Sequence, residues 1–152
     1  SKAIELDPDY AYAYYNRGVA KGNLEDYYGA IEDFSKVIEL DPDYAIAYYN
    51  RGIAKYKLKD YYGAIEDYSK SLELDPDYAN AYNNRVNAKD NLKDYNGAIN
   101  DFSKAIELNP DYVNRGISKE DLGDLNGACA DWRKAVSLGD KEAAQWVRDQ
   151  CN

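Results

Sequence analysis

The sequence predicts an all-α solenoid in which pairs of helices stack side by side along the chain. The phrase Leu-Asp-Pro-Asp-Tyr recurs, with Asn for the first Asp in its last copy, so that Pro8, Pro42, Pro76 and Pro110 are each 34 residues apart. Between the prolines, apolar and small residues return at helical spacings. A repeat of this length cannot bury its apolar face alone, so the copies must stack on one another.

The chain opens on the end of a helix. Residues 1–6 read Ser-Lys-Ala-Ile-Glu-Leu, which is also the sequence at the end of the second helix of a later copy, at 103–108. We therefore assign residues 1–10 to the end of a preceding repeat, and we expect the chain to be a fragment of a longer array.

Three full repeats follow, at residues 11–44, 45–78 and 79–112. In the first, we expect helices at about residues 10–23 and 28–40. The prolines end the second helices, because the residue before a proline is pushed out of helical geometry.

Aspartates are the expected caps of the first helices. Asp9, Asp43 and Asp77 each stand just before a first helix. Their side chains are suited to accept hydrogen bonds from the free N–H groups there.

The fourth repeat, residues 113–140, is shortened. It lacks the four residues equivalent to Ala11–Tyr14, which is close to one helical turn. Residues 141–152 form an amphipathic helix that we interpret as a C-terminal cap. The residues expected to cover the last apolar face are Ala144, Trp146 and Val147.

The repeat resembles the tetratricopeptide repeat (TPR), whose pattern is W-x2-L-G-x2-Y, then A-x3-F, then P. The Trp place holds Tyr14, Tyr48 and Tyr82; the Gly place Gly18, Gly52, Val86 and Gly116; the Ala place Ala30, Ala64, Ala98 and Ala128; the aromatic place Phe34, Tyr68, Phe102 and Trp132. The resemblance implies a right-handed α-α superhelical solenoid of TPR helix pairs. It also implies a protein-binding scaffold whose first helices line a concave groove.

The chain departs from this pattern at the Leu place, which holds Arg in every copy, with Asp 16 residues later. These pairs are Arg17 and Asp33, Arg51 and Asp67, Arg85 and Asp101, and Arg115 and Asp131. Because a charge at an apolar place must be paired, we expect each Arg to cross to the Asp of its own second helix. In the alternative, the Arg stem packs while its head stays in water. Val86, at a Gly place, should widen its helix pair or move its neighbours.

Composition excludes several classes of function. With 28 acidic and 19 basic residues the net charge is −9, which disfavours nucleic acid and favours a neutral or basic protein segment. The chain has no His, so catalysis or metal binding by imidazole is excluded. No apolar run approaches the roughly 20 residues of a membrane span. We expect no catalytic residue, no metal site and no cofactor.

The two cysteines admit two states. Cys129 begins the last repeat's second helix and Cys151 ends the cap, so a disulfide is geometrically feasible if the two helices run antiparallel. In a reducing compartment the expected outcome is two packed thiols.

The groove positions implied by the resemblance form the candidate peptide-binding set. It consists of Tyr12, Tyr15, Asn16, Val19, Ile46, Tyr49, Asn50, Ile53, Tyr56, Asn80, Asn83, Asn84, Asn87 and Asn114. Other groove positions are Gly22, Asp90, Val113, Ile117 and Glu120. One Asn stands at the same place in every copy, and an amide can bond a peptide backbone as donor and acceptor. In the alternative, each Asn bonds a neighbouring helix and serves the scaffold.

The sequence therefore favours a scaffold that binds an extended peptide or helix through an asparagine ladder and tyrosines. The alternative is a structural module that self-associates end to end through uncapped solenoid ends. An enzyme is disfavoured, because adjacent carboxylates such as Glu32 and Asp33 do not face each other on a helix.

Overall fold

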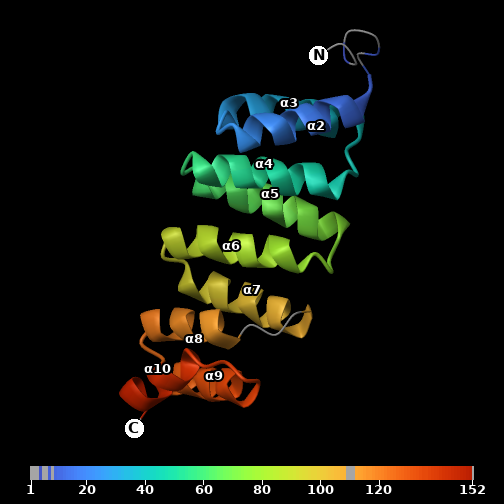
Figure 1. Ribbon diagram of the computed structural model, residues 1–152. Coiled ribbons are helices and arrows are strands. Elements are labelled where there is room, and N and C mark those ends of the chain that lie inside the picture. The colour runs from blue at the N-terminus through green and yellow to red at the C-terminus, as the bar shows by residue number, and fades with distance from the viewer. Residues whose placement is uncertain (1–3, 5–6, 8, 109–111, 152) are drawn as a thin grey trace. The chain divides into compact units, whose positions relative to one another are not determined.

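The computed structural model describes residues 4, 7, 9–108 and 112–151. Every regular element among them is a helix, as the sequence predicts (Figure 1). The chain forms two compact units, Ser1–Asn84 and Arg85–Asn152.

The first unit contains two complete helix pairs. Its elements are α2 (Ala11–Asn23), α3 (Tyr27–Leu40), α4 (Ala45–Lys57), α5 (Tyr61–Leu74) and the first part of α6 (Ala79–Asn91). α2 packs on α3, α4 packs on α5, and α3 also contacts α4, so the first two repeats stack (Figure 1).

The second unit continues the pattern with the rest of α6. Its further elements are α7 (Tyr95–Leu108), α8 (Tyr112–Asp121), α9 (Leu125–Ser137) and α10 (Ala143–Gln150). α8 packs on both α7 and α9, and α10 packs on α9.

In the shortened repeat, a tyrosine lies beside the repeated arginine, as in the first repeat. The Arg115 guanidinium lies 5.5 Å from the centre of the Tyr112 ring, as that of Arg17 lies 5.4 Å from the Tyr14 ring. Tyr112 therefore has the same contact with Arg115 that Tyr14 has with Arg17.

Glycine allows the close approach of paired helices. A Cβ on Gly18 would lie 2.9 Å from Cε1 of Phe34, closer than real side chains pack. In the third repeat Val86 takes this place and is fully buried against Ala98 and Phe102. The additional methyl groups are therefore held inside the core of that repeat.

The predicted caps of the first helices are wrong for α2 and α4. Tyr10 and Tyr44 are the N-cap residues there, and neither makes a side-chain cap hydrogen bond. The Asp43 N–H instead donates to Asp41 Oδ1 at 3.2 Å, inside the proline turn. The aspartates therefore shape the turn between repeats.

Aspartates cap the second helices instead. In each repeat the side chain accepts the N–H of a glycine three residues later, at 2.9 to 3.0 Å. A Cβ on Gly63 would lie only 2.3 Å from Asp60 Oδ2, so glycine is needed there. The cap pairs are Asp26 with Gly29, Asp60 with Gly63, Asp94 with Gly97, and Asp124 with Gly127.

The predicted Arg–Asp pairs are confirmed in all four repeats. The Arg Nη2 lies 2.6 to 2.7 Å from the Asp Oδ1, and Nε donates to Oδ2. Sequence reasoning missed a lysine that joins each pair at 2.7 to 3.1 Å. These lysines are Lys21, Lys55, Lys89 and Lys119.

These contacts keep the carboxylates of Asp33 and Asp131 ionised. Burial by itself would raise the pKa of Asp131, but hydrogen bonds from Arg115 and Lys119 outweigh it and lower the pKa below its ordinary value. The pKa of Asp33 is lowered in the same way. The repeated charges therefore belong to the scaffold.

A tryptophan cluster and a disulfide close the second unit. Trp132 is buried beside Trp146, with 5.7 Å between ring centroids. Ala143, not Ala144, is the fully buried alanine of α10. Cys129 and Cys151 form a disulfide with Cα atoms 5.6 Å apart, in place of the two thiols expected in a reducing compartment.

Candidate functional site

Three exposed residues of the candidate set lie on α2 and α4 of the first unit. Tyr12 is 56% exposed and Ile46 is 37% exposed. Asn16 is also exposed, and it has no hydrogen bond within the described part of the chain. These three side chains are available to a partner.

Tyr15 and Tyr49 are instead half-buried in the scaffold. The Tyr15 ring lies 5.5 Å from that of Tyr44, and the Tyr49 ring lies 4.6 Å from that of Tyr78. Burial raises the pKa of Tyr49, and the hydrogen bond from Asn84 opposes this rise. The two rings therefore pack mainly against tyrosines of the scaffold, and only part of each ring is exposed.

The repeated asparagines bind these tyrosines. Asn50 Nδ2 donates to the Tyr15 hydroxyl at 3.1 Å, and Asn84 Nδ2 donates to the Tyr49 hydroxyl at 3.0 Å. Each asparagine thus reaches the tyrosine of the preceding repeat. One N–H of each amide therefore bonds a neighbouring helix, as in the alternative in which the asparagines serve the scaffold.

The remaining asparagines fall into two groups. Asn80 is exposed, whereas Asn83 Oδ1 is buried and has no hydrogen-bond partner among the described residues. Asn87 and Asn114 are exposed, but they belong to the second unit. Part of the candidate set therefore lies in the first unit, and the other part belongs to the second unit.

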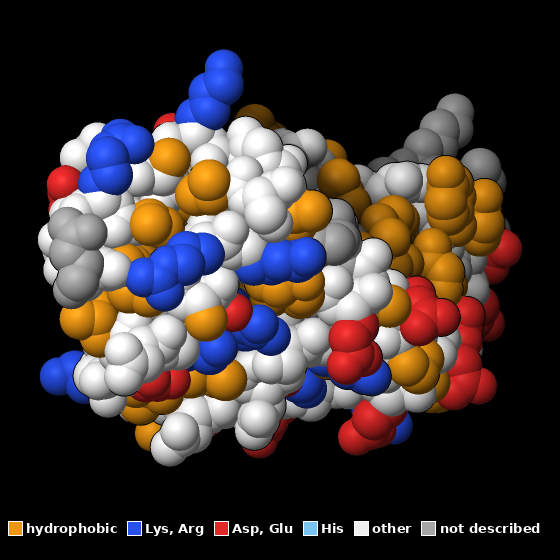
Figure 2. Space-filling model, turned by 90° about the horizontal axis from the view of Figure 1, so that it is seen from below, with side chains coloured by type: hydrophobic (Ala, Val, Ile, Leu, Met, Phe, Trp, Pro, Cys, Tyr) orange, Lys and Arg blue, Asp and Glu red, His pale blue; other side chains and the backbone are white. Residues whose placement is uncertain are grey.

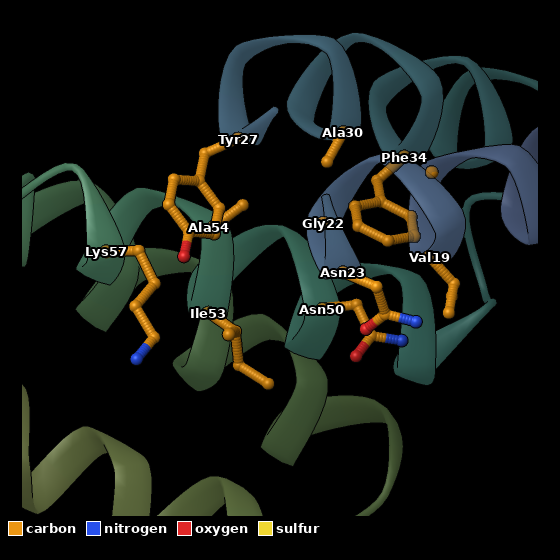
Figure 3. Close-up of a pocket in the computed structure, with 11 residues that line it drawn as sticks. Val19, Gly22, Asn23, Tyr27, Ala30, Phe34, Asn50, Ile53, Ala54 and Lys57 are labelled. Carbon is orange, nitrogen blue, oxygen red and sulfur yellow. The ribbon is translucent and has the colours of Figure 1, made fainter. Parts of the chain in front are cut away.

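A cavity of about 280 Å³ opens between α2, α3 and α4 (Figure 3). The lining residues are Gly18, Val19, Gly22, Asn23, Tyr27, Ala30, Phe34, Asn50, Ile53, Ala54 and Lys57. In Figure 3 the amides of Asn23 and Asn50 point toward one end, and Tyr27 and Lys57 lie at the other. Of the candidate set, the cavity brings together Val19, Asn50 and Ile53.

Gly22 lines the cavity and places no side chain in it. A Cβ on Gly22 would have its nearest neighbour, the Ala30 Cβ, 4.0 Å away. One repeat later the same place holds Tyr56, whose ring packs on Tyr61 at 5.4 Å between centroids. Sequence reasoning placed Gly22 at the groove but missed the cavity, although this exchange of Gly for Tyr was a visible signal.

The surface of α2 and α4 differs in charge from the whole chain. Neither helix contains an acidic residue. Their arginines and the lysines Lys21 and Lys55 are paired with Asp33 and Asp67. Lys57 is exposed and makes no ion pair with the described residues. Charge is also uneven on the face seen in Figure 2, where basic and acidic side chains gather in different places.

Two further features bear on function. Among the residues that the structure describes, no helix is long and apolar enough to cross a membrane. The same residues include no group of three metal-ligating His, Cys, Asp or Glu side chains.

The fold and the repeated pattern define the class of protein. The tetratricopeptide repeat model matches residues 11–44, 45–78 and 79–112, so the chain belongs to the tetratricopeptide repeat family. This repeat is a protein-interaction scaffold, and no catalytic family is indicated. The comparison with curated proteins gives no match.

Solved structures with the same architecture support this assignment. A crystal structure of MamA is 26% identical, with 94% of this chain and 86% of that chain covered and a TM-score of 0.87. The Arabidopsis OM64 TPR domain is 25% identical, with 74% and 93% covered and a TM-score of 0.67. The first TPR of Spaghetti (RPAP3), bound to an HSP90 peptide, is 24% identical, with the same coverage and a TM-score of 0.71; this likeness concerns the fold alone.

Proposed function

We propose that the chain is a recruiting module that holds an extended peptide or a helix of a partner protein against α2 and α4. The observation that carries this proposal is the exposed apolar surface of Tyr12 and Ile46 on α2 and α4, the two helices whose other residues line much of an open cavity. Exposed apolar side chains next to a concave, partly apolar site are typical of interaction surfaces.

The asparagines contribute less than a complete ladder would. Asn50 and Asn84 already give one N–H to the scaffold, which leaves the other N–H and the carbonyl oxygen for a peptide backbone. Each such bond adds only about 1 kcal/mol net. Affinity must therefore come mainly from burying Tyr12, Ile46 and the cavity wall, and the amides set register.

The partner segment is proposed to be neutral or basic overall. The net charge of −9 slows the approach of acidic segments, whereas the surface of α2 and α4 itself carries no acidic side chain. Long-range charge therefore acts on encounter more than on the bound contact.

Selection from a displayed random-peptide library, followed by affinity measurement by calorimetry, tests the proposal. The double variant Tyr12→Ser, Ile46→Ser should bind the selected peptides about tenfold or more weakly, because it removes two exposed apolar contacts. Its matched control is Tyr28→Ser, Tyr62→Ser, which changes two tyrosines that are each 73% exposed on α3 and α5.

Equal loss in both double variants, or no selected peptide at all, would contradict the proposal. Light scattering over a range of protein concentrations separates the alternative. A self-association module would form larger species as the protein concentration rises. If it did so and the Tyr12→Ser, Ile46→Ser variant bound peptides as well as the native protein, peptide binding at these residues would be contradicted.

A further inference from the structure

We propose that the cavity beside Gly22 binds an aromatic side chain of the partner, packed on Tyr27, with a neighbouring carboxylate close to Lys57. This inference rests on the proposed peptide-binding function and adds the chemistry that the partner segment must carry. It assigns to the first repeat a pocket that the second repeat fills with its own tyrosine.

The second repeat is an internal template for the occupant. Tyr56 stands where Gly22 does, and Tyr61 stands where Tyr27 does, because each pair is one repeat apart in the sequence. The two rings of the second repeat meet edge to face, with an interplanar angle of 61°. In the first repeat Tyr27 lines the cavity, and Gly22 provides no ring to meet it. A ring from another chain can complete the same edge-to-face pair.

The size of the cavity agrees with an aromatic ring. A dry cavity of about 150 Å³ is sufficient to hold benzene. The cavity beside Gly22 is about 280 Å³, and its walls include the apolar side chains of Val19, Phe34, Ile53 and Ala54. A phenyl or phenol group with part of its backbone therefore fits.

The charge at the cavity selects a carboxylate beside the ring. Among the described residues that line it, Lys57 is the one charged side chain. Its ammonium group has no ion pair among the described residues, so an anionic group can approach it. An ammonium or guanidinium of the partner would be repelled at this point. The amides of Asn23 and Asn50 at the other end can bond the peptide backbone (Figure 3).

Nuclear magnetic resonance titration with three small probes tests this inference. The probes are N-acetyl-L-phenylalanine, its C-terminal amide, and N-acetyl-L-leucine. The first should shift the backbone amide signals of Gly22, Tyr27, Ala54 and Lys57 in a saturable way. The leucine probe should bind about fivefold or more weakly because it lacks the ring. The uncharged amide should also bind more weakly, and Lys57→Gln should abolish this difference.

Gly22→Tyr is the decisive variant. It places in the first repeat the side chain that the second repeat already has, so it should close the cavity and weaken the phenylalanine probe about tenfold or more. It should also raise the melting temperature, because a glycine is replaced in the last turn of α2, where its backbone is helical. Lost binding together with higher stability cannot come from misfolding. The matched control, Ala20→Tyr, adds a ring at an exposed place on the same helix and should leave binding unchanged.

The outcomes separate this inference from the proposed function. Unchanged probe binding in Gly22→Tyr, or a leucine probe that binds as well as the phenylalanine probe, overturns the aromatic pocket even if library peptides bind through Tyr12 and Ile46. Probe binding that Gly22→Tyr abolishes, with no peptide selected from the library, upholds the pocket and contradicts the peptide-binding function. An absence of shifts at the four amides overturns the inference directly.

Discussion

One position of the repeat holds a different amino acid in each of the four copies. Gly22, Tyr56, Asp90 and Glu120 stand at the same place in successive copies. Gly22 leaves a cavity, Tyr56 supplies a half-buried ring, Asp90 is half-buried, and Glu120 is exposed. At the scale of the residue, one backbone scaffold thus presents a different local chemistry in each repeat.

Asp90 makes the second unit sensitive to pH. Its Oδ1 is buried without a hydrogen-bond partner among the described residues. Burial, and then repulsion from Asp121, raise the pKa of Asp90 above its ordinary value of 3.8, and the hydrogen bond from Ser118 opposes the rise. The folded state therefore keeps this proton to a higher pH than the unfolded state. Stability falls as pH rises from about 3.8 through the raised pKa.

We predict that Asp90→Asn stabilises the protein at neutral pH, because a neutral amide replaces a poorly solvated charge while still accepting from Ser118. The gain should shrink as the pH falls through the raised pKa of Asp90 toward about 3.8, because the carboxyl of the folded native protein takes up its proton in that range. Urea unfolding at a series of pH values measures both effects. Asp121→Asn should give a smaller gain in the same direction. Equal stability of Asp90→Asn and the native protein at neutral pH would contradict the prediction.

At the scale of the element, α10 is held by a covalent link and by apolar packing. The disulfide joins Cys129 of α9 to Cys151, which follows α10, across a sequence separation of 22 residues. Trp146 and Val147 pack on the same cluster as Trp132. Arg133 Nη2 also donates to the Cys151 carbonyl at 2.7 Å. The end of the chain is therefore fastened to the last repeat at several points.

Reduction of this disulfide should destabilise the second unit by about 3 kcal/mol, because a loop of this length is no longer closed in the unfolded state. The chain's two tryptophans, Trp132 and Trp146, both lie in the affected cluster. Tryptophan fluorescence during denaturant unfolding, with and without a reductant, measures the change. A Cys151→Ser variant should unfold like the reduced protein and should not respond to the reductant. Identical curves for the oxidised and reduced protein would show that the link adds nothing.

At the scale of the whole molecule, the repeats are expected to respond locally to a change. Stability in repeat proteins is approximately a sum of repeat and nearest-neighbour contributions. In this chain the tryptophans report on the second unit, whereas circular dichroism reports on all helices. The two signals can therefore distinguish where a substitution acts.

Ser71→Ala should stabilise the first unit by about 1 kcal/mol, because Ser71 Oγ is fully buried without a partner among the described residues. Val37 fills the same place one repeat earlier, so an apolar side chain is suited to it. We expect the unfolding curve from circular dichroism to shift and the tryptophan curve to stay. Ser69→Ala is the control, because Ser69 Oγ donates to the Ile65 carbonyl and its loss should not stabilise. Equal shifts in both signals would indicate that the chain unfolds as one unit.

The sequence predicted the candidate surface better than the roles of its residues. Tyr12 and Ile46 are exposed as expected, but Tyr15 and Tyr49 are largely engaged inside the scaffold. Their hydroxyls accept from asparagines 35 residues later. A pattern within one repeat cannot reveal such a contact, because it depends on how the next repeat packs.

The sequence by itself determined the helix pairs, the tetratricopeptide repeat family and the pairing of Arg17 with Asp33 and its equivalents, because these follow from a local pattern present in every copy. Only the tertiary structure decided that Asn50 bonds Tyr15, that Gly22 borders a cavity and that Cys129 is joined to Cys151. Each of these depends on side chains from elements that are distant in sequence, and their meeting is fixed by the packing of one helix against the next.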